Sequence, residues 1–197
     1  LVTRGLRWRV LLNDALPLHR AFSIMNVAYL VNGLLPLRIG EVARIYLARR
    51  SPQAVPGWQT ASTIIVERLL DLLAVVVLMS VALTVGPLPP AMRSAGVVMG
   101  AGALIGFIML VILAGRRQSL HRVLGFLMER LGGLSRLDLA TWLDQFLDGL
   151  QPLTRPSALL LALFWTAMSW LLSVIAGYVL MFAFFDQGDW AVTALYI

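Results

Sequence analysis

The sequence predicts an all-α polytopic membrane protein with about three full transmembrane helices, a re-entrant helical hairpin and amphipathic helices at the cytoplasmic interface. Composition is the first reason: 59% of the 197 residues are hydrophobic and 13% are charged, about half the charged fraction of soluble domains. Length is the second reason. Three stretches without a charged residue are long enough for the roughly 20 residues that cross a bilayer, and they lie at 72–92, 95–115 and 157–185.

The net charge of +6 arises from an excess of Arg over acidic residues. In a soluble protein this excess would indicate nucleic-acid binding. Cytoplasmic loops of membrane proteins collect the same charge, so we expect no nucleic-acid partner. The absence of Cys excludes disulfides and thiolate metal sites. With His19 and His121 as the only imidazoles in the sequence, we expect no metal site and no cofactor.

The distribution of Arg predicts the topology. Arg residues cluster before residue 21, at 44–50 and within 116–155, whereas the loops 86–90 and 186–189 carry none. The positive-inside rule therefore places the Arg-rich segments in the cytoplasm and the two other loops outside. We expect a multi-pass protein of a bacterial inner membrane.

The two ends of the sequence suggest that 1–197 is one partial membrane domain. The chain begins with Leu1 rather than Met and ends inside the apolar run 190–197, which we interpret as the start of a further span. Residues 1–20 are expected to form a cytoplasmic or interfacial segment because four Arg residues fall within them.

The stretch 21–50 is difficult to place as a full transmembrane crossing, because Arg residues flank its apolar part on both sides. A full crossing would place one Arg cluster outside, whereas a re-entrant hairpin keeps both clusters in the cytoplasm. Gly33, Pro36 and Gly40 near the middle are expected to interrupt the helix and form the tip. We therefore favour the hairpin over the full crossing.

The remaining elements alternate across the membrane. The apolar segments predict transmembrane helices at 57–84, 94–115 and 156–185. Between the last two, the segment 116–155 carries Leu and Phe at helical spacing. This segment is interpreted as a pair of amphipathic helices lying on the cytoplasmic face, with a simple connector as the alternative.

Six charged residues interrupt apolar segments at membrane depth. Glu67 lies ten residues beyond Gly57, which corresponds to roughly 15 Å along a helix. A charged residue at the centre of a span costs about 2.5–3.5 kcal/mol on insertion scales, so the helix 57–84 needs polar partners. We predict that at least one Arg of the hairpin lies within about 4 Å of Glu67 or Asp71.

These residues form the candidate site, in which Arg would hold a lipid phosphate and the carboxylates would orient Arg or meet a cationic head group. The candidate substrate-binding residues are Asn32, Arg38, Glu41, Arg44, Glu67, Arg68 and Asp71. Free backbone N–H groups near Gly40 would further favour an anion. Three Arg and three carboxylates also balance formally, so a neutral structural network is the competing interpretation. No catalytic residue is assigned, although Glu67 and Asp71 could act as a carboxylate pair.

The same residues carry a resemblance to a known family. Asn32 and the string Leu35-Pro36-Leu37-Arg38-Ile39-Gly40-Glu41, with Arg44 and the later Glu67-Arg68-Leu69-Leu70-Asp71, resemble the transmembrane region of bacterial lysylphosphatidylglycerol synthases and related flippase-like membrane proteins. The upstream Leu6-Arg7-Trp8-Arg9 also fits.

The resemblance implies lipid handling. It suggests a translocase that moves a phospholipid or a polyprenyl-linked lipid between leaflets, with a homo-oligomer as a further possible assembly. The alternative is a membrane enzyme or accessory subunit in the synthesis of aminoacyl phospholipids or lipid-linked sugars. In the best-known members of the family, a separate soluble domain performs the aminoacyl transfer.

Overall fold

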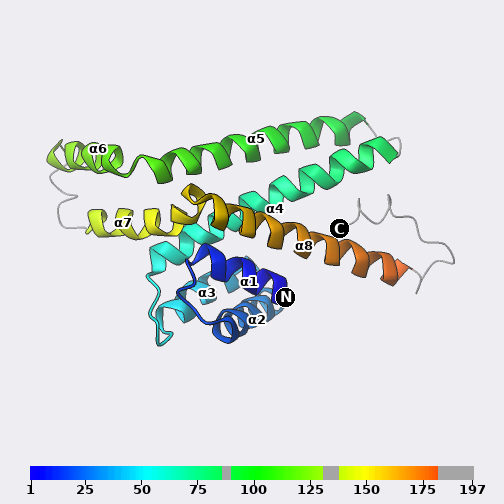
Figure 1. The fold of residues 1–197 in the computed structure, drawn as a ribbon, viewed down its shortest axis with the longest axis horizontal. Coiled ribbons are helices and arrows are strands. Elements are labelled where there is room, and N and C mark those ends of the chain that lie inside the picture. The colour runs from blue at the N-terminus through cyan, green and yellow to red at the C-terminus, as the bar shows by residue number, and fades with distance from the viewer. Residues whose placement is uncertain (86–89, 131–137, 182–197) are drawn as a thin grey trace.

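The computed structural model describes residues 1–85, 90–130 and 138–181, and these residues form helices joined by short loops (Figure 1). In chain order the helices are α1 (Val2–Leu11), α2 (Leu18–Leu34), α3 (Gly40–Arg49), α4 (Gly57–Val85), α5 (Pro90–Gly115), α6 (Arg117–Arg130), α7 (Leu139–Leu150), the 3-10 helix η2 (Gln151–Thr154) and α8 (Pro156–Met181). The predicted all-α class is confirmed. The last residues of the predicted helix 156–185 and the predicted span at 190–197 lie outside the described residues.

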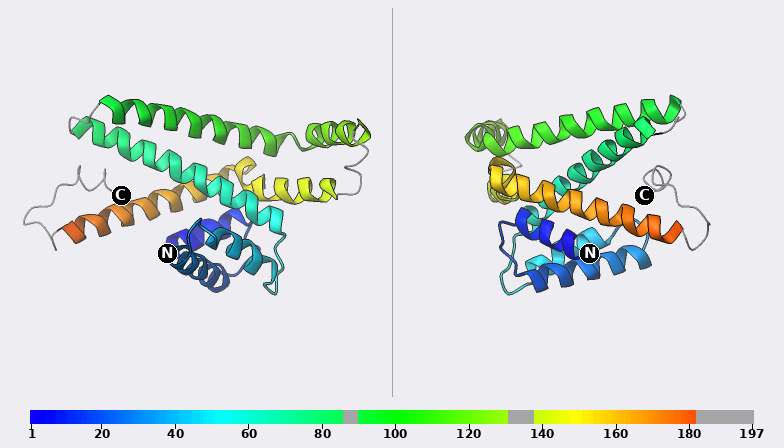
Figure 2. Two further views of the ribbon diagram at one scale, coloured as in Figure 1. Left: turned by 180° about the vertical axis from the view of Figure 1, so that it is seen from behind. Right: turned by 45° about the vertical axis from the view of Figure 1, so that its right-hand side comes forward.

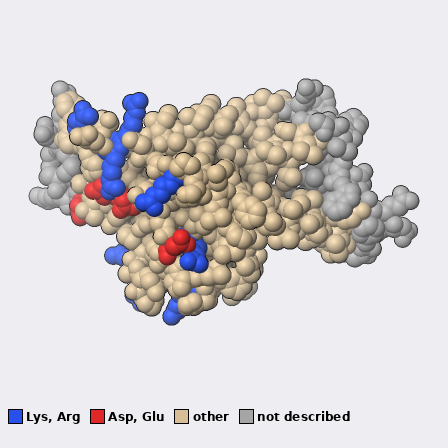
Figure 3. Space-filling view, in the orientation of Figure 1, with Lys and Arg blue, Asp and Glu red and all other residues tan. Residues whose placement is uncertain are grey.

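Two of the described helices are long and apolar enough to cross a membrane, Ser94–Gly115 within α5 and Pro156–Met181 as α8. Only 11% and 22% of their most apolar windows are buried, so both helices present hydrocarbon outward rather than to a protein core. Figure 3 shows the charged side chains drawn on one face spread over one half of the molecule, the half that holds α6, α7 and the N-terminal helices in Figure 1. Three charges interrupt α4 at positions 67, 68 and 71, which sets it apart from these two apolar helices.

Helices α2 and α3 form a helical hairpin with its break at 35–39. Leu37 and Arg38 turn the chain with positive φ angles of 66° and 53°. Pro36 lies in this break, but Gly33 does not interrupt the helix, because it falls in the last turn of α2. Gly40 begins α3, where a Cβ atom would lie 2.0 Å from the carbonyl oxygen of Ala28, so only Gly allows this approach of the two helices.

Helix α1 lies between two apolar cores. Trp8 and Leu12 pack with α2 and α3, whereas Leu11 packs with side chains of α4, α5, α7 and α8. The N-terminal segment, which the sequence assigned only to the cytoplasmic side or the interface, therefore joins the hairpin to the long helices.

The described residues of the segment 116–155 form helices, as its periodicity predicted, and the apolar face of α7 packs on α4. Leu147 and Leu150 of α7 are buried in the core shared with α4, and Figure 2 shows α7 beside the first turns of that helix. Gly149 allows the close contact, because a Cβ atom there would lie 1.9 Å from Ser62 Oγ. The periodicity of a helix marks its apolar face but does not tell whether lipid or protein covers it.

Candidate functional site

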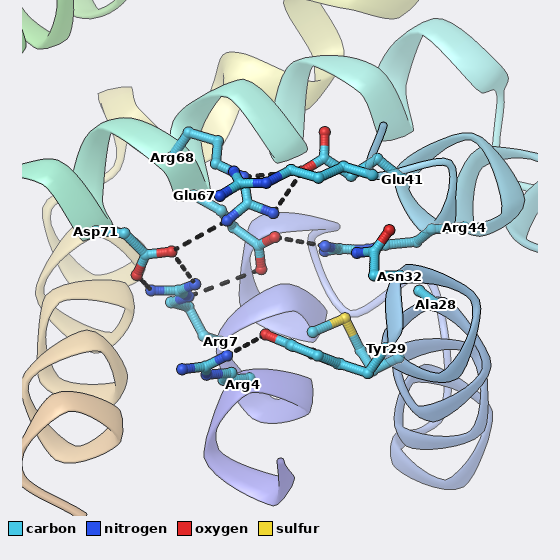
Figure 4. A pocket seen from close by; sticks show the side chains of 12 residues that line it. Arg4, Arg7, Ala28, Tyr29, Asn32, Glu41, Arg44, Glu67, Arg68 and Asp71 are labelled. Carbon is cyan, nitrogen blue, oxygen red and sulfur yellow. Dashed lines mark hydrogen bonds and ion pairs between the residues drawn. The ribbon is translucent and has the colours of Figure 1, made fainter. Parts of the chain in front are cut away.

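Glu67 is the buried centre of the site, only 3% exposed, on the inner face of α4. Arg44 of α3 approaches it with 2.6 Å between Nη1 and Oε2. Arg7 of α1 lies on its other side, with 3.7 Å between Nε and Oε1. The prediction that an Arg of the hairpin would reach Glu67 or Asp71 is confirmed, and Figure 4 shows the arrangement.

Asp71 lies one helical turn further along α4 and faces the same side. Arg7 holds it with two hydrogen bonds, 2.6 Å from Nη1 to Oδ1 and 3.2 Å from Nη2 to Oδ2. The indole N–H of Trp170 on α8 also donates to Asp71 Oδ1 at 3.3 Å. Arg7 donates in addition to the hydroxyl of Thr166 at 3.3 Å. One guanidinium therefore ties α1 to both α4 and α8.

The outer edge of the site is a more exposed pair on α4 and α3. Arg68 Nε donates to Glu41 Oε1 at 2.9 Å, and the two side chains are 44% and 31% exposed. Arg38, at the tip of the hairpin, is exposed, and within the described chain its guanidinium forms no ion pair or hydrogen bond. Arg38 nevertheless lies near the other charged residues of the candidate site, because all of them line one cavity, which is described below.

Asn32 lines the cavity described below and also fixes the start of α3. Its Oδ1 accepts a hydrogen bond of 2.8 Å from the backbone N–H of Gly40, at the start of α3. The next amide, that of Glu41, donates to the carbonyl of Arg38 at 3.1 Å. The prediction of free N–H groups near Gly40 therefore does not hold for the amides of Gly40 and Glu41, because Asn32 and the turn itself already satisfy these two donors.

A cavity of about 330 Å³ lies between the hairpin, α1 and α4, a volume in the range of small-molecule sites. Among the residues that line it are five Arg and three carboxylates, a formal excess of two positive charges. The charged residues are Arg4, Arg7, Arg38, Arg44, Arg68, Glu41, Glu67 and Asp71. The formal balance that the sequence suggested does not hold, because it omitted Arg4 and Arg7 of α1. This excess favours an anion.

Arg44 has unused hydrogen-bonding capacity inside this cavity. It is 3% exposed, and the face of the Trp8 ring packs against it with 4.0 Å between Cζ and the ring centroid. Its Nε and Nη2 have no acceptor among the described protein atoms, and Glu67 Oε1 has no donor. Buried polar groups are rarely left unpaired in proteins. The geometry therefore leaves two buried N–H groups of Arg44 without an acceptor on the described part of the protein.

The sequence did not single out α1 as part of the site. Arg4 and Arg7 lie three residues apart and Leu11 four residues further, so all three share one face of the helix. Arg4 donates to the Tyr29 hydroxyl of α2 and, at 3.2 Å, to Ser169 Oγ of α8. The apolar residues between and beyond these Arg residues were the available signal, because a helix with Trp8, Leu11 and Leu12 is expected to pack inside a protein.

The structure brings no three His, Asp or Glu side chains of the described residues together as metal ligands would require. What the fold defines is a helical membrane region with a buried cluster of Arg and carboxylates where α1, the hairpin and α4 meet. The chain belongs to the family described as the lysylphosphatidylglycerol synthase TM region, whose model matches residues 1–197. No curated protein and no solved structure matches the chain.

Proposed function

We propose that this chain is part of a lipid translocase, and that its arginine cavity binds the anionic head group of a membrane lipid during passage between leaflets. The observation that carries the proposal is the pair of buried, unpartnered N–H groups on Arg44 in a cavity with two excess positive charges. The membership in a family of membrane regions named for a phospholipid synthase agrees with it.

The chemistry of the cavity suits a phosphodiester. A guanidinium donates in a planar fork that matches two oxygens of a phosphate, and it stays charged at all accessible pH values. Glu67 and Asp71 hold Arg44 and Arg7 in place through short ion pairs. A phosphate with one negative charge would reduce the positive excess without cancelling it. The carboxylates then also supply acceptors for a head group that carries a hydroxyl or an ammonium.

The placement of the cluster along α4 suits translocation. Glu67 lies ten residues from the first residue of α4, roughly 15 Å along the helix axis. Charged residues at such depth in a membrane usually mark a pathway for a polar substrate, since apolar packing would be more stable than buried ions. The exposed Arg38 and the exposed pair of Arg68 and Glu41 would meet the head group before the buried Arg44 does.

Arg38→Gln tests this proposal most cleanly. Because Arg38 is exposed and forms no ion pair within the described chain, its loss should leave the fold intact. We expect translocation of a fluorescent phospholipid in proteoliposomes to fall at least tenfold, while the melting temperature of the solubilised protein changes little. Arg49→Gln, on the exposed surface of α3, is the matched control and should translocate normally. Normal translocation by Arg38→Gln would contradict the assignment of the site.

A further inference from the structure

A second cavity lies between α4 and α8, next to the arginine cavity. Its volume is about 440 Å³. Its wall is formed mainly by aliphatic side chains of the two helices, among them Leu73, Ala74, Val77, Leu163 and Ala167. A cavity with such walls cannot hold the charged part of a ligand, because aliphatic side chains offer no polar group that would replace the hydration of the charge. We call it the apolar groove.

Two residues of the apolar groove, Thr166 and Trp170, carry polar groups, and both groups bond to the arginine cavity. Thr166 accepts a hydrogen bond from Arg7 at 3.3 Å. Trp170 donates to Asp71 at 3.3 Å, while its ring remains part of the groove wall. A single layer of side chains therefore separates the two cavities. The cavity on one side of this layer is charged, and the groove on the other side is apolar.

We propose that the apolar groove holds an acyl chain of the same lipid whose head group occupies the arginine cavity. This inference rests on the proposed function and extends it, because it assigns a separate part of the fold to the chains of the lipid. The apolar groove begins where the charged cavity ends, at Asp71 and Trp170. A lipid bound by its phosphate must place its chains somewhere, and this groove is apolar and adjacent.

The apolar groove is expected to affect lipid binding by providing space for the chain rather than by adding affinity. Lipid chains outside the protein are as apolar as the groove wall, so moving a chain from the bilayer into the groove gains little. Filling the groove with a large side chain should nevertheless block the diacyl lipid, because its head group cannot enter without its chains. A head group that has no chains should be unaffected.

Ala167→Trp provides the test, with Ala101→Trp as the matched control. Ala167 lines the groove on α8, and Ala101 is an exposed residue of α5 away from it. The full-length protein in phosphatidylcholine nanodiscs would be titrated by calorimetry with dioleoylphosphatidylglycerol and, separately, with glycerophosphoglycerol. We expect Ala167→Trp to weaken binding of the diacyl lipid at least tenfold and binding of the chain-free head group less than twofold. The control should bind both probes as the wild type does.

The possible failures are distinguishable. Unchanged binding of the diacyl lipid by Ala167→Trp would refute the groove assignment and leave the arginine site standing. Equal weakening of both probes would also refute it, because the groove would not be separable from the head-group site. Binding of neither probe by the wild type would refute the proposed function itself. If Ala167→Trp does not fold, Val77→Trp on the α4 wall, where Val77 is already exposed, gives the same comparison.

Discussion

Replacing Arg44 with Gln should destabilise the protein far more than replacing Arg68 with Gln, although Arg44 pairs with one carboxylate and Arg68 with two, Glu41 and Asp71. The side chains of Arg44 and Glu67 are each 4% exposed and lie 2.6 Å apart. Loss of Arg44 leaves Glu67 buried with only the longer contact of 3.7 Å to Arg7. Breaking a buried pair in this way costs about 3–5 kcal/mol.

The pair of Arg68 and Glu41 is the internal control, because its side chains are 44% and 31% exposed. Exposed pairs contribute about 0–1 kcal/mol. For a chain of this size, each kcal/mol corresponds to roughly 2–4 °C in melting temperature. We therefore expect Arg44→Gln to lower the melting temperature of the solubilised protein by roughly 6–20 °C, and Arg68→Gln by no more than about 4 °C.

The double variant Arg44→Gln/Glu67→Gln completes the measurement. Removing both charges leaves no buried carboxylate without its partner, so part of the lost stability should return. Thermal unfolding of the four proteins, followed by circular dichroism in one detergent, supplies the comparison. Equal losses for Arg44→Gln and Arg68→Gln, or no recovery in the double variant, would refute the view that burial sets the strength of this network.

Three further predictions concern the scaffold around the site. Gly40→Ala should lower the melting temperature, because its Cβ would meet the Ala28 carbonyl at 2.0 Å, while Gly33→Ala, with open space around it, should not. The hydrogen bond from Arg117 holds the pKa of Asp144 below its ordinary 3.8. The stabilisation that this ion pair gives to the folded protein should be present above pH 3.8 and lost as the pH falls through the lower pKa of Asp144 in the folded state. The difference in melting temperature between wild type and Asp144→Asn should therefore vanish in acid. Cysteines at positions 18 and 51 should label from the same side of the membrane, and labelling from opposite sides would contradict the re-entrant hairpin.

The site residues of α3 and α4 were predictable because a charged side chain in an apolar helix must find a polar partner inside the protein. Glu67 and Asp71 are four residues apart, which puts both on one face of α4 whatever the fold. The cost of facing lipid then requires a partner with opposite charge, and Arg44 is that partner. The sequence could not tell which of Arg38, Arg44 and Arg68 would be buried and which exposed, because their burial depends on how α3 packs on α4.

The contribution of α1 depended on tertiary packing. Nothing local to Arg7 relates it to Asp71, which is far away in the sequence, or to Thr166 on α8. The same holds for α7, whose apolar face suits a membrane surface as well as it suits α4. Local sequence sets the helical period and the face that avoids water, but long-range packing chooses the surface that covers this face.

The sequence by itself determined the helical membrane class, the positions of the long apolar helices and the grouping of charge near the hairpin and α4, because bilayer thickness and the cost of burying charge act on short stretches of chain. Only the tertiary structure decided the sign of the net charge in the arginine cavity. It brought Arg4 and Arg7 of α1 against the hairpin and α4, which turned a formally neutral set into one with two excess positive charges. Such an excess depends on which helices meet, and contacts between distant segments are set by how complete helix surfaces fit together.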